Sequence, residues 1–366
     1  MVKNEEKRIK GCIDNISSIA DEVIVIDNGS EDHTVEIARN MGAVVSICTD
    51  KKFDMARNQY LDIASHDWIF VLDADEYIDS TAKENVIELI REKSNCSSFM
   101  VPRYEYIGEG KWALIEICRL FRNDHRIRYT NTMMHASVGP AIRRINGING
   151  RANFAIHHFD GLLGNKRMEE KRKRNINLTL DDIEKKRCQG NDLYYLYCYL
   201  GLEYAALGDY EKAEYIYRKA MRIGSDYKQF ANIYLAQNHF IQGKYTDAYR
   251  EAYNLVGVKN DIKQRALLLL AEIEYCNGNY KKTFELCEEI EKFDDNNAAN
   301  KLNMATLLLD KDRDKAMQYL LKAKQINPFV MESIIYQKGG DMNVFAQQTS
   351  FLSCTYNAKE LMGILL

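Results

Sequence analysis

The pattern of apolar and polar positions changes near residue 165. Before it, short apolar runs alternate with segments in which apolar residues recur every three or four positions. The apolar runs predict buried strands over 23–26, 43–48, 68–72, 99–102, 115–121 and 154–158. The periodic segments predict helices over 7–20, 34–41, 53–64 and 80–93. Strands alternating with helices predict an α/β domain built on a parallel sheet.

After residue 165 the pattern is helical throughout and contains an internal repeat. A Gly-x-Tyr-x-x-Ala/Thr motif begins at Gly208, Gly243 and Gly278, at a constant spacing of 35 residues. This spacing, with small residues where two helices would touch and aromatic residues between them, matches the tetratricopeptide pattern. A looser fourth copy carries Ala316 and Pro328. An ordinary helical bundle is the alternative, which the constant spacing disfavours.

These patterns predict an α/β domain followed by an all-α solenoid of stacked helix pairs. We expect the α/β domain over residues 1–164 and a helical linker over 165–190. The repeats would then occupy 191–330, and capping helices 331–366. A length of 366 residues fits two domains better than one.

Charge and cysteine usage limit the functional classes. The net charge is −3, yet residues 103–174 contain 15 Lys and Arg against 7 Asp and Glu. A basic middle section suits a phosphate-bearing ligand or an acidic partner, although a solvated helix face is the alternative. Nothing here demands nucleic acid, and no apolar run reaches the length of a membrane span. Nine cysteines without a Cys-x-x-Cys pair favour reduced thiols and a cytoplasmic location.

Carboxylates follow two of the predicted strands. The run over 68–72 ends in Asp73-Ala74-Asp75-Glu76, and the run over 23–26 ends in Asp27. If the chain stays extended, Asp73 and Asp75 point the same way, at the edge where open α/β sheets bind ligands. Paired carboxylates there suit Mg²⁺ or Mn²⁺ carrying a diphosphate. A solvated turn or a helix N-cap is the alternative. Carboxylates at this edge could accept hydrogen bonds from the hydroxyls of a ribose and also hold a cation that binds a diphosphate. A ligand with both parts is a nucleotide sugar.

Four motifs, in this order, resemble those of family 2 glycosyltransferases of the GT-A fold. They are Val2-Lys3-Asn4-Glu5-Glu6, Asp27-Asn28-Gly29-Ser30-x-Asp32-x-Thr34, Ala56-Arg57-Asn58 and Phe70-x-Leu72-Asp73-Ala74-Asp75-Glu76. With the repeats, the architecture is similar to that of bacterial peptide S-glycosyltransferases of the sublancin type. The resemblance implies that Asp27 binds the uridine base or ribose, that Glu5 helps to close the base pocket, and that Asp75 binds Mn²⁺ or Mg²⁺. The nucleotide-sugar-binding residues that it implies are Asn4, Glu5, Asp27, Asn28, Ser30, Arg57, Asn58, Asp73, Arg119 and Arg122.

Two departures from the family pattern bear on activity. The first strand of the family is cut to two residues here, so either the true start lies upstream or the enzyme is compromised. Relatives often carry a glutamate, a candidate general base, where this chain has Ala136. Glu116, His135 or Glu76 would then have to serve as the base. His135 and His158 are each candidates for a base or a second metal ligand, with a structural histidine as the alternative.

The predicted function is metal-dependent, inverting transfer of a sugar from a UDP-sugar to a peptide or glycan acceptor. The repeats would select the acceptor, bind a protein partner or support a homodimer. The alternative is a non-catalytic tetratricopeptide scaffold with a degenerate glycosyltransferase domain. A nucleotidyltransferase shares the sheet and carboxylates but lacks here the usual Gly-rich, Lys-bearing entry loop.

Overall fold

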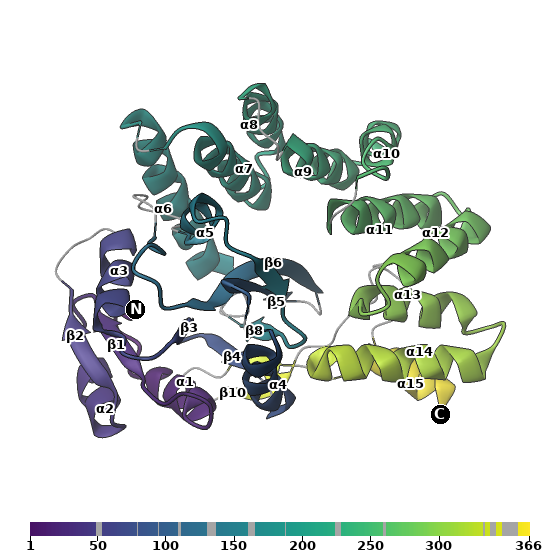
Figure 1. Ribbon diagram of the computed structural model, residues 1–366. Helices are drawn as coiled ribbons and strands as arrows, with labels where there is room; N and C mark the ends of the chain where they lie inside the picture. The colour runs from purple at the N-terminus through teal and green to yellow at the C-terminus, as the bar shows by residue number, and fades with distance from the viewer. Residues whose placement is uncertain are drawn as a thin grey trace. The chain divides into compact units, whose positions relative to one another are not determined.

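The structure, a computed structural model, divides the chain into two compact units. It describes residues 1–48, 53–78, 80–93, 95–108, 111–129, 137–159, 165–186, 188–223, 228–258, 261–331, 334–336, 342–345 and 358–366. The first unit comprises Met1–Gly108, Trp112–Gly164 and Ile335–Asn343, and the second comprises Glu109–Lys111, Asn165–Ile334 and Val344–Leu366. Figure 1 labels most of the helices and strands of both units.

The first unit opens with the predicted strands and helices in their predicted order. β1 (Ile24–Asp27) and β2 (Val44–Ile47) pair in parallel, with Ile24 opposite Val44. Val2 forms a parallel bridge to Asp27 on the other edge of β1. α1 (Ile9–Ile16) and α2 (Thr34–Asn40) pack around this ladder, where Ile9, Ile13 and Ala38 form one apolar cluster with Val2 and Val25.

A second, mixed sheet carries the rest of the unit. Its path is β3-β6-β5-β8-β4, with β7 also paired to β5. The strands are β3 (Trp68–Phe70), β4 (Glu76–Ile78), β5 (Ser98–Gly108), β6 (Lys111–Arg122), β7 (Asn149–Arg151) and β8 (Ile156–His158). The prediction that the Trp68 strand is a parallel strand was wrong, because β3 pairs antiparallel with β6. An apolar run reveals that both faces of a strand are covered but not the direction of its neighbour.

Helices cover both faces of β3 and β6. Alternate residues of these two strands point to opposite faces and pack in two separate apolar clusters, one with α3 (Phe53–Ile63) and one with α4 (Ser80–Glu92). Ile69 and Phe121 pack with Ala56 and Tyr60 of α3. Leu120 packs on the other face with Val86 and Leu89 of α4. α5 (Gly139–Arg144) adds Ile142 to the first of these cores and was not predicted from the sequence.

The second unit confirms the predicted helical repeats. Its helices are α6 (Asn165–Glu184), α7 (Gly190–Ala206), α8 (Tyr210–Arg222), α9 (Lys228–Ile241), α10 (Tyr245–Tyr253), α11 (Asp261–Cys276), α12 (Tyr280–Phe293), α13 (Ala298–Leu308), α14 (Arg313–Ile326) and α15 (Ala358–Leu365), with a 3₁₀ turn over Pro328–Met331. Gly208, Gly243 and Gly278 have positive φ, of 80°, 74° and 76°. Each ends one helix and lets the chain turn directly into the next.

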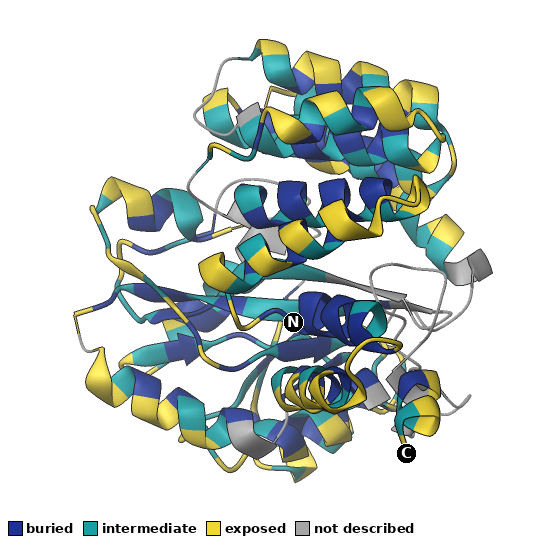
Figure 2. Cartoon of the chain, turned by 90° about the vertical axis from the view of Figure 1, so that its right-hand side faces the viewer, coloured by how far each residue is buried: buried dark blue, intermediate teal, exposed yellow. Residues whose placement is uncertain are grey.

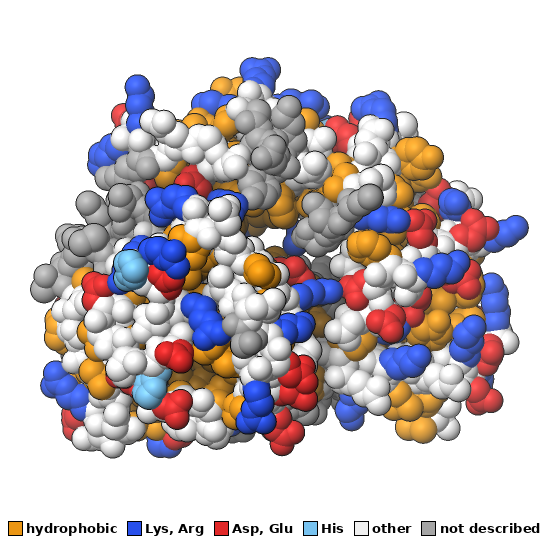
Figure 3. All heavy atoms as spheres, in the orientation of Figure 1, with side chains coloured by type: hydrophobic (Ala, Val, Ile, Leu, Met, Phe, Trp, Pro, Cys, Tyr) orange, Lys and Arg blue, Asp and Glu red, His pale blue; other side chains and the backbone are white. Residues whose placement is uncertain are grey.

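Burial along the repeat helices follows the expected pattern. In most of these helices buried positions run along one side and exposed positions along the other (Figure 2), whereas α13 has no exposed residue. Ala213, Ala248 and Thr283 of the repeat motif are all fully buried, as are Ala316 and Leu320 of the fourth copy. On the face drawn in Figure 3, acidic and basic side chains are interspersed over the repeats.

Two regions outside the repeats differ from expectation. The presumed linker helix α6 contributes Ile176 to the same core as Tyr194 and Leu200 of α7. Residues 331–366, expected to be helical, include two paired strands, β9 (Ile334–Tyr336) and β10 (Met342–Phe345). The β-branched and aromatic residues of these two segments favour strands. Among the helices of the described residues, none combines the length and apolarity needed to cross a bilayer.

Candidate active site

The first part of the site is the loop at the carboxyl end of β1. Asp27 is 2% exposed, and its Oδ2 accepts hydrogen bonds from the backbone N–H groups of Gly29 and Ser30, at 3.1 and 3.0 Å. No donor among the described residues reaches its other oxygen, Oδ1. A buried carboxylate oxygen without a donor is costly unless a ligand or water supplies one.

The Asn4–Glu6 segment is tied to this loop. The backbone N–H of Asn4 donates to Ser30 Oγ at 2.8 Å, and that of Glu5 donates to Thr34 Oγ1 at 2.7 Å. Asn4 adopts a positive φ of 56°, and its side chain accepts from the N–H of Glu31. The predicted residues Asn4, Glu5, Asp27, Asn28 and Ser30 therefore lie together. The Glu5 carboxylate pairs with Arg8 at 3.0 Å.

The second part of the site is the turn after β3, and here the extended-strand prediction was wrong. Residues 74–75 form a turn, in which the Glu76 N–H donates to the Asp73 carbonyl at 3.0 Å. Asp73 and Asp75 therefore do not project side by side from one strand, and each has its own partners. Ala74 and Asp75 are compatible with either conformation, so the sequence alone could not decide.

Asp73 lies between two arginines. Its Oδ1 is 3.5 Å from Arg57, and its Oδ2 accepts from Arg119. Burial by itself would raise the pKa of Asp73, but the guanidiniums of Arg119 and Arg57 outweigh it and hold that pKa well below the usual range. Asp73 is therefore an anion, and two cations of the basic middle section and α3 meet beside it.

Glu76 cannot serve as the predicted general base. Its side chain is fully buried, and its Oε1 accepts from Arg103 at 2.6 Å and from Arg119 at 2.7 Å. Its Oε2 accepts from the Asp73 N–H at 2.9 Å. A carboxylate whose oxygens are held by three donors is not available to an acceptor. Glu76 instead joins the turn to the strands of the sheet.

Asp75 forms the third part of the site with His158 and Glu105. His158 Nε2 is 3.4 Å from Asp75 Oδ2, and His158 Nδ1 is 2.5 Å from Glu105 Oε2. Burial lowers the pKa of His158, but the bonds to the two carboxylates outweigh it and raise that pKa to about 10. The same contacts lower the pKa of Asp75 and bring that of Glu105 to about 2, against the opposing effect of burial.

Sequence reasoning missed Glu105 and Arg103. Arg103 pairs with both Glu105 and Glu76. The signal was present in Arg103-Tyr104-Glu105-Tyr106, where opposite charges recur every second residue of an otherwise hydrophobic strand. Two charges on one face of such a strand need partners there.

Two other predicted residues do not join this group. Glu116, a candidate base, pairs with Arg151 at 2.7 Å. The Arg122 guanidinium lies 4.1 Å from the centre of the Trp68 ring. Arg119 and Arg122 are three residues apart on β6, so strand alternation directs them to opposite faces. Arg122, expected among the nucleotide-sugar-binding residues, therefore does not lie on the face of the sheet where Arg119 contacts Asp73.

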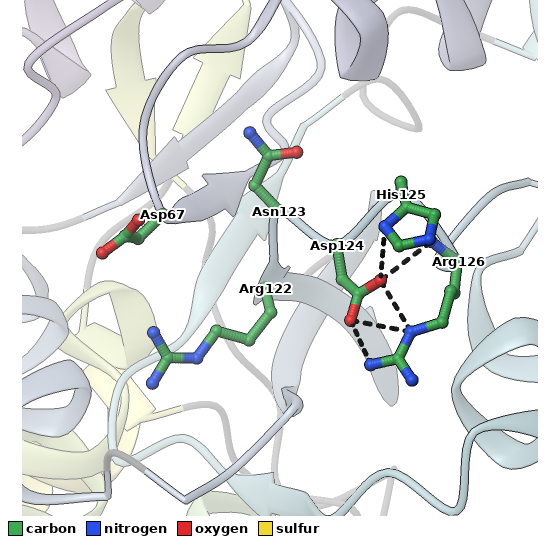
Figure 4. A pocket seen from close by; sticks show the side chains of 6 residues that line it. All are labelled: Asp67, Arg122, Asn123, Asp124, His125 and Arg126. Carbon is green, nitrogen blue, oxygen red and sulfur yellow. Dashed lines mark hydrogen bonds and ion pairs between the residues drawn. The ribbon is translucent and has the colours of Figure 1, made fainter.

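Arg122 lines a different hollow, an open polar pocket of about 500 Å³ (Figure 4). Its lining residues are Asp67, Arg122, Asn123, Asp124, His125 and Arg126. In Figure 4, Asp124 contacts His125 and Arg126, while Arg122 points away from them. The pocket lies beyond the amino end of β3, whereas Asp73 follows its carboxyl end. It is therefore separate from the candidate site.

Asn58, expected in the nucleotide pocket, holds a neighbouring segment in place. Its Oδ1 accepts from the Tyr129 N–H at 2.8 Å, and its Nδ2 donates to the Tyr129 carbonyl at 3.4 Å. His135, the remaining candidate base, and Ala136 lie outside the described residues.

We expect Asn58→Ala to lower the free energy of unfolding by about 1–3 kcal/mol, because it leaves buried backbone groups of Tyr129 without partners. Asn58→Asp keeps the acceptor and should cost less. Urea unfolding measures both. A variant with unchanged stability but weakened nucleotide binding would show instead that Asn58 acts on the ligand.

The residues around Asp75 are compatible with a divalent cation. Within the described ranges, no three His, Cys, Asp or Glu side chains are arranged to hold a metal ion. Asp75 Oδ2 and His158 Nε2 nevertheless converge on each other, with side-chain exposures of 18% and 14%. The raised pKa keeps the His158 ring protonated when no cation is bound, so a cation would displace the proton on Nε2. The Asp75 carboxylate and the imidazole that results would suit Mn²⁺ or Mg²⁺ that takes its other ligands from phosphates and water.

Comparison with known proteins identifies the family to which this domain is related. Residues 1–148 match the family described as Glycosyl transferase family 2. The chain is 28% identical over 250 residues to the SPbeta prophage-derived glycosyltransferase SunS of Bacillus subtilis, covering 66% of this chain and 55% of SunS. It is 31% identical over 146 residues to an uncharacterised glycosyltransferase of Rickettsia typhi, covering 40% of this chain and 44% of that protein.

A further relative is described by its repeats. A TPR repeat-containing protein of Synechococcus elongatus is 35% identical over 131 residues, which cover 35% of this chain and 32% of that protein. The chain thus spans about half the length of the first curated relatives that it matches.

Proposed function

We propose, from the premise that residues 1–148 form a family 2 glycosyltransferase domain, that this protein transfers a sugar from a UDP-sugar to an acceptor. The observation that carries the proposal is the convergence of three polar groups from separate motifs. They are the Asp27 loop, the Arg57–Asp73–Arg119 cluster and the Asp75–His158 pair. Ala74 packs against the apolar cluster of Val2 and Val25, and Cys12 Sγ lies 3.6 Å from the Asp73 carbonyl, so the Asp73–Asp75 turn lies beside the strand that ends at Asp27.

Each of the three groups of residues is chemically suited to bind one part of the UDP-sugar donor. Asp27 Oδ1, a buried acceptor, suits an N–H of the base or a ribose hydroxyl. Arg57 and Arg119 supply positive charge for the diphosphate. Asp75 and His158 would hold Mn²⁺ or Mg²⁺, which when bound supplies charge that stabilises the departing diphosphate. The acceptor attacks the anomeric carbon from the opposite side, which inverts its configuration.

The acceptor class is proposed from the repeats rather than from the site. We propose a peptide or glycan acceptor, selected with help from the tetratricopeptide repeats, because stacked helix pairs present extended surfaces for such chains. The named relative SunS is itself a glycosyltransferase. A protein partner or a homodimer bound through the repeats is compatible with the same surfaces.

Calorimetric titration with UDP, with and without Mn²⁺, tests the donor site. We expect the wild-type protein to bind UDP in the micromolar to millimolar range, about 1 μM to 1 mM, and to bind it better with Mn²⁺. Asp75→Ala should weaken the metal-dependent part at least about tenfold, which corresponds to about 1.4 kcal/mol. Asp14→Ala is the matched control, because Asp14 is half exposed and pairs with Lys10 on the surface of α1.

Two outcomes would contradict the proposal. If wild-type protein binds no UDP with either metal, the non-catalytic scaffold becomes the better description. If UDP binds but no UDP-sugar is hydrolysed or transferred, the domain binds nucleotide without catalysis. Mass spectrometry of UDP-sugar turnover over a panel of donors separates these cases and identifies the sugar.

A further inference from the structure

Glu105 occupies a position that connects the candidate metal ligands to the sheet. In β8, His158 is directly opposite Glu105 of β5 on one side and Glu76 of β4 on the other. Residues opposite each other across a sheet share a face. The three side chains therefore form one row across three strands, with the imidazole between two carboxylates.

The contacts of Glu105 fix both ends of its carboxylate. Oε2 bonds His158 Nδ1 at 2.5 Å, and Oε1 pairs with Arg103. Arg103 is itself held by Glu76 at 2.6 Å, and its side chain is 16% exposed. The Arg103 ion pair therefore fixes the Glu105 carboxylate, which cannot turn away from the imidazole without losing that ion pair.

The consequence for His158 is directional. With Nδ1 bonded to Glu105, the other ring nitrogen, Nε2, faces Asp75 at 3.4 Å. A histidine that binds a metal through one ring nitrogen commonly donates the N–H of the other to a carboxylate. This hydrogen bond sets the tautomer and the orientation of the ring.

We propose that Glu105 is a positioning residue, which fixes the His158 ring so that Nε2 and Asp75 together receive the divalent cation. This inference rests on the proposed function, because it assigns a role at the metal site of that function. Glu105 does not touch the donor or the cation and acts only through His158.

The test is Mn²⁺ binding in the presence of UDP, followed by electron paramagnetic resonance of the full-length protein. Loss of a carboxylate behind a metal-binding histidine costs about 10- to 100-fold in metal affinity. We expect that loss in Glu105→Gln, together with a weaker ¹⁴N coupling from the imidazole to Mn²⁺. His158→Gln should abolish the ¹⁴N coupling. Asp62→Asn, which removes an ion-paired carboxylate from the same unit, is the matched control and should change neither quantity.

A purely structural role for Glu105 predicts a different result. It would lower the urea midpoint and leave the affinity and the ¹⁴N coupling of the folded fraction unchanged, which would overturn the proposal. If Glu105→Gln does not fold, Glu105→Asp replaces it, because the shorter side chain keeps the charge but withdraws from Nδ1. Mn²⁺ binding by Glu105→Asp equal to that of the wild type would also overturn the proposal.

Failure of the proposed function gives another pattern. If wild-type protein binds no Mn²⁺ with UDP, both the metal site and the role of Glu105 fail. If wild-type protein binds Mn²⁺ and Glu105→Gln binds it equally well, only the role of Glu105 fails.

Discussion

Arg119→Met should lower the free energy of unfolding of the first unit by about 3–5 kcal/mol. Arg119 is 7% exposed and bridges Asp73 and Glu76, whose own side chain is fully buried. Methionine fills much of the volume of the Arg119 side chain. The loss of unfolding free energy therefore measures the missing charge rather than a packing defect. Two carboxylates would then share Arg57 and Arg103 as their remaining counter-ions.

Urea unfolding, followed by hydrogen exchange in peptides from β3 and β6, measures this loss. Arg119→Lys should recover part of it, because lysine restores the charge without the planar fork that reaches both carboxylates. Arg126→Met is the control, since the Arg126–Asp124 pair is on the surface, and we expect no measurable shift of the midpoint. A loss below about 1 kcal/mol for Arg119→Met would mean that water replaces the guanidinium, contrary to the buried cluster described above.

Gly201→Ala should destabilise the repeats by about 1–3 kcal/mol, although alanine favours helices. A Cβ on Gly201 would lie 2.6 Å from Cδ1 of Tyr217 and closer still to Cε1. Tyr217 is 1% exposed, so its ring has little room to move. The gain in helix propensity, about 1 kcal/mol, is smaller than the expected cost of overpacking.

A double-mutant cycle separates these two contributions. In a Tyr217→Leu background the ring is gone, and Gly201→Ala should then be neutral or stabilising. Gly11→Ala serves as the control within a helix, because nothing lies within 4 Å of its Cβ position. Hydrogen exchange in α7 and α8 reports the local stability. Additive effects of Gly201→Ala and Tyr217→Leu would show that the two residues do not contact each other as described.

The sequence predicted elements better than pairings. The helices α2, α3 and α4 and the strand β2 lie within about two residues of their predicted bounds, because periodicity and turn residues are local signals. The repeats could be predicted from the constant 35-residue spacing of their motif, since each helix pair packs against neighbouring pairs in the same way. The direction of β3 and the turn at Ala74–Asp75 were not predictable, because both depend on β6, which is about fifty residues away in sequence.

The candidate site shows the same difference between local sequence signals and contacts that join distant parts of the chain. Asp27, Asp73 and Asp75 could be predicted as candidate site residues because they follow apolar runs and their motifs are contiguous in sequence. Glu105 was missed because its partner, His158, is far away in sequence and becomes adjacent only through the parallel pairing of β5 and β8. Glu76 was misassigned because a carboxylate in a motif looks the same whether it is free or bonded to Arg103 and Arg119.

The row of Glu76, His158 and Glu105 also has a consequence for folding kinetics. Its members belong to β4, β8 and β5, and 82 residues separate Glu76 from His158 (158 − 76). Contacts this far apart in sequence form late, after the loops between them have closed. If the proposed cation binds at Asp75 and His158, it therefore cannot nucleate the domain. The appearance of metal-dependent UDP binding during refolding should coincide with the last step of sheet assembly, which makes the ligand a reporter of the finished fold.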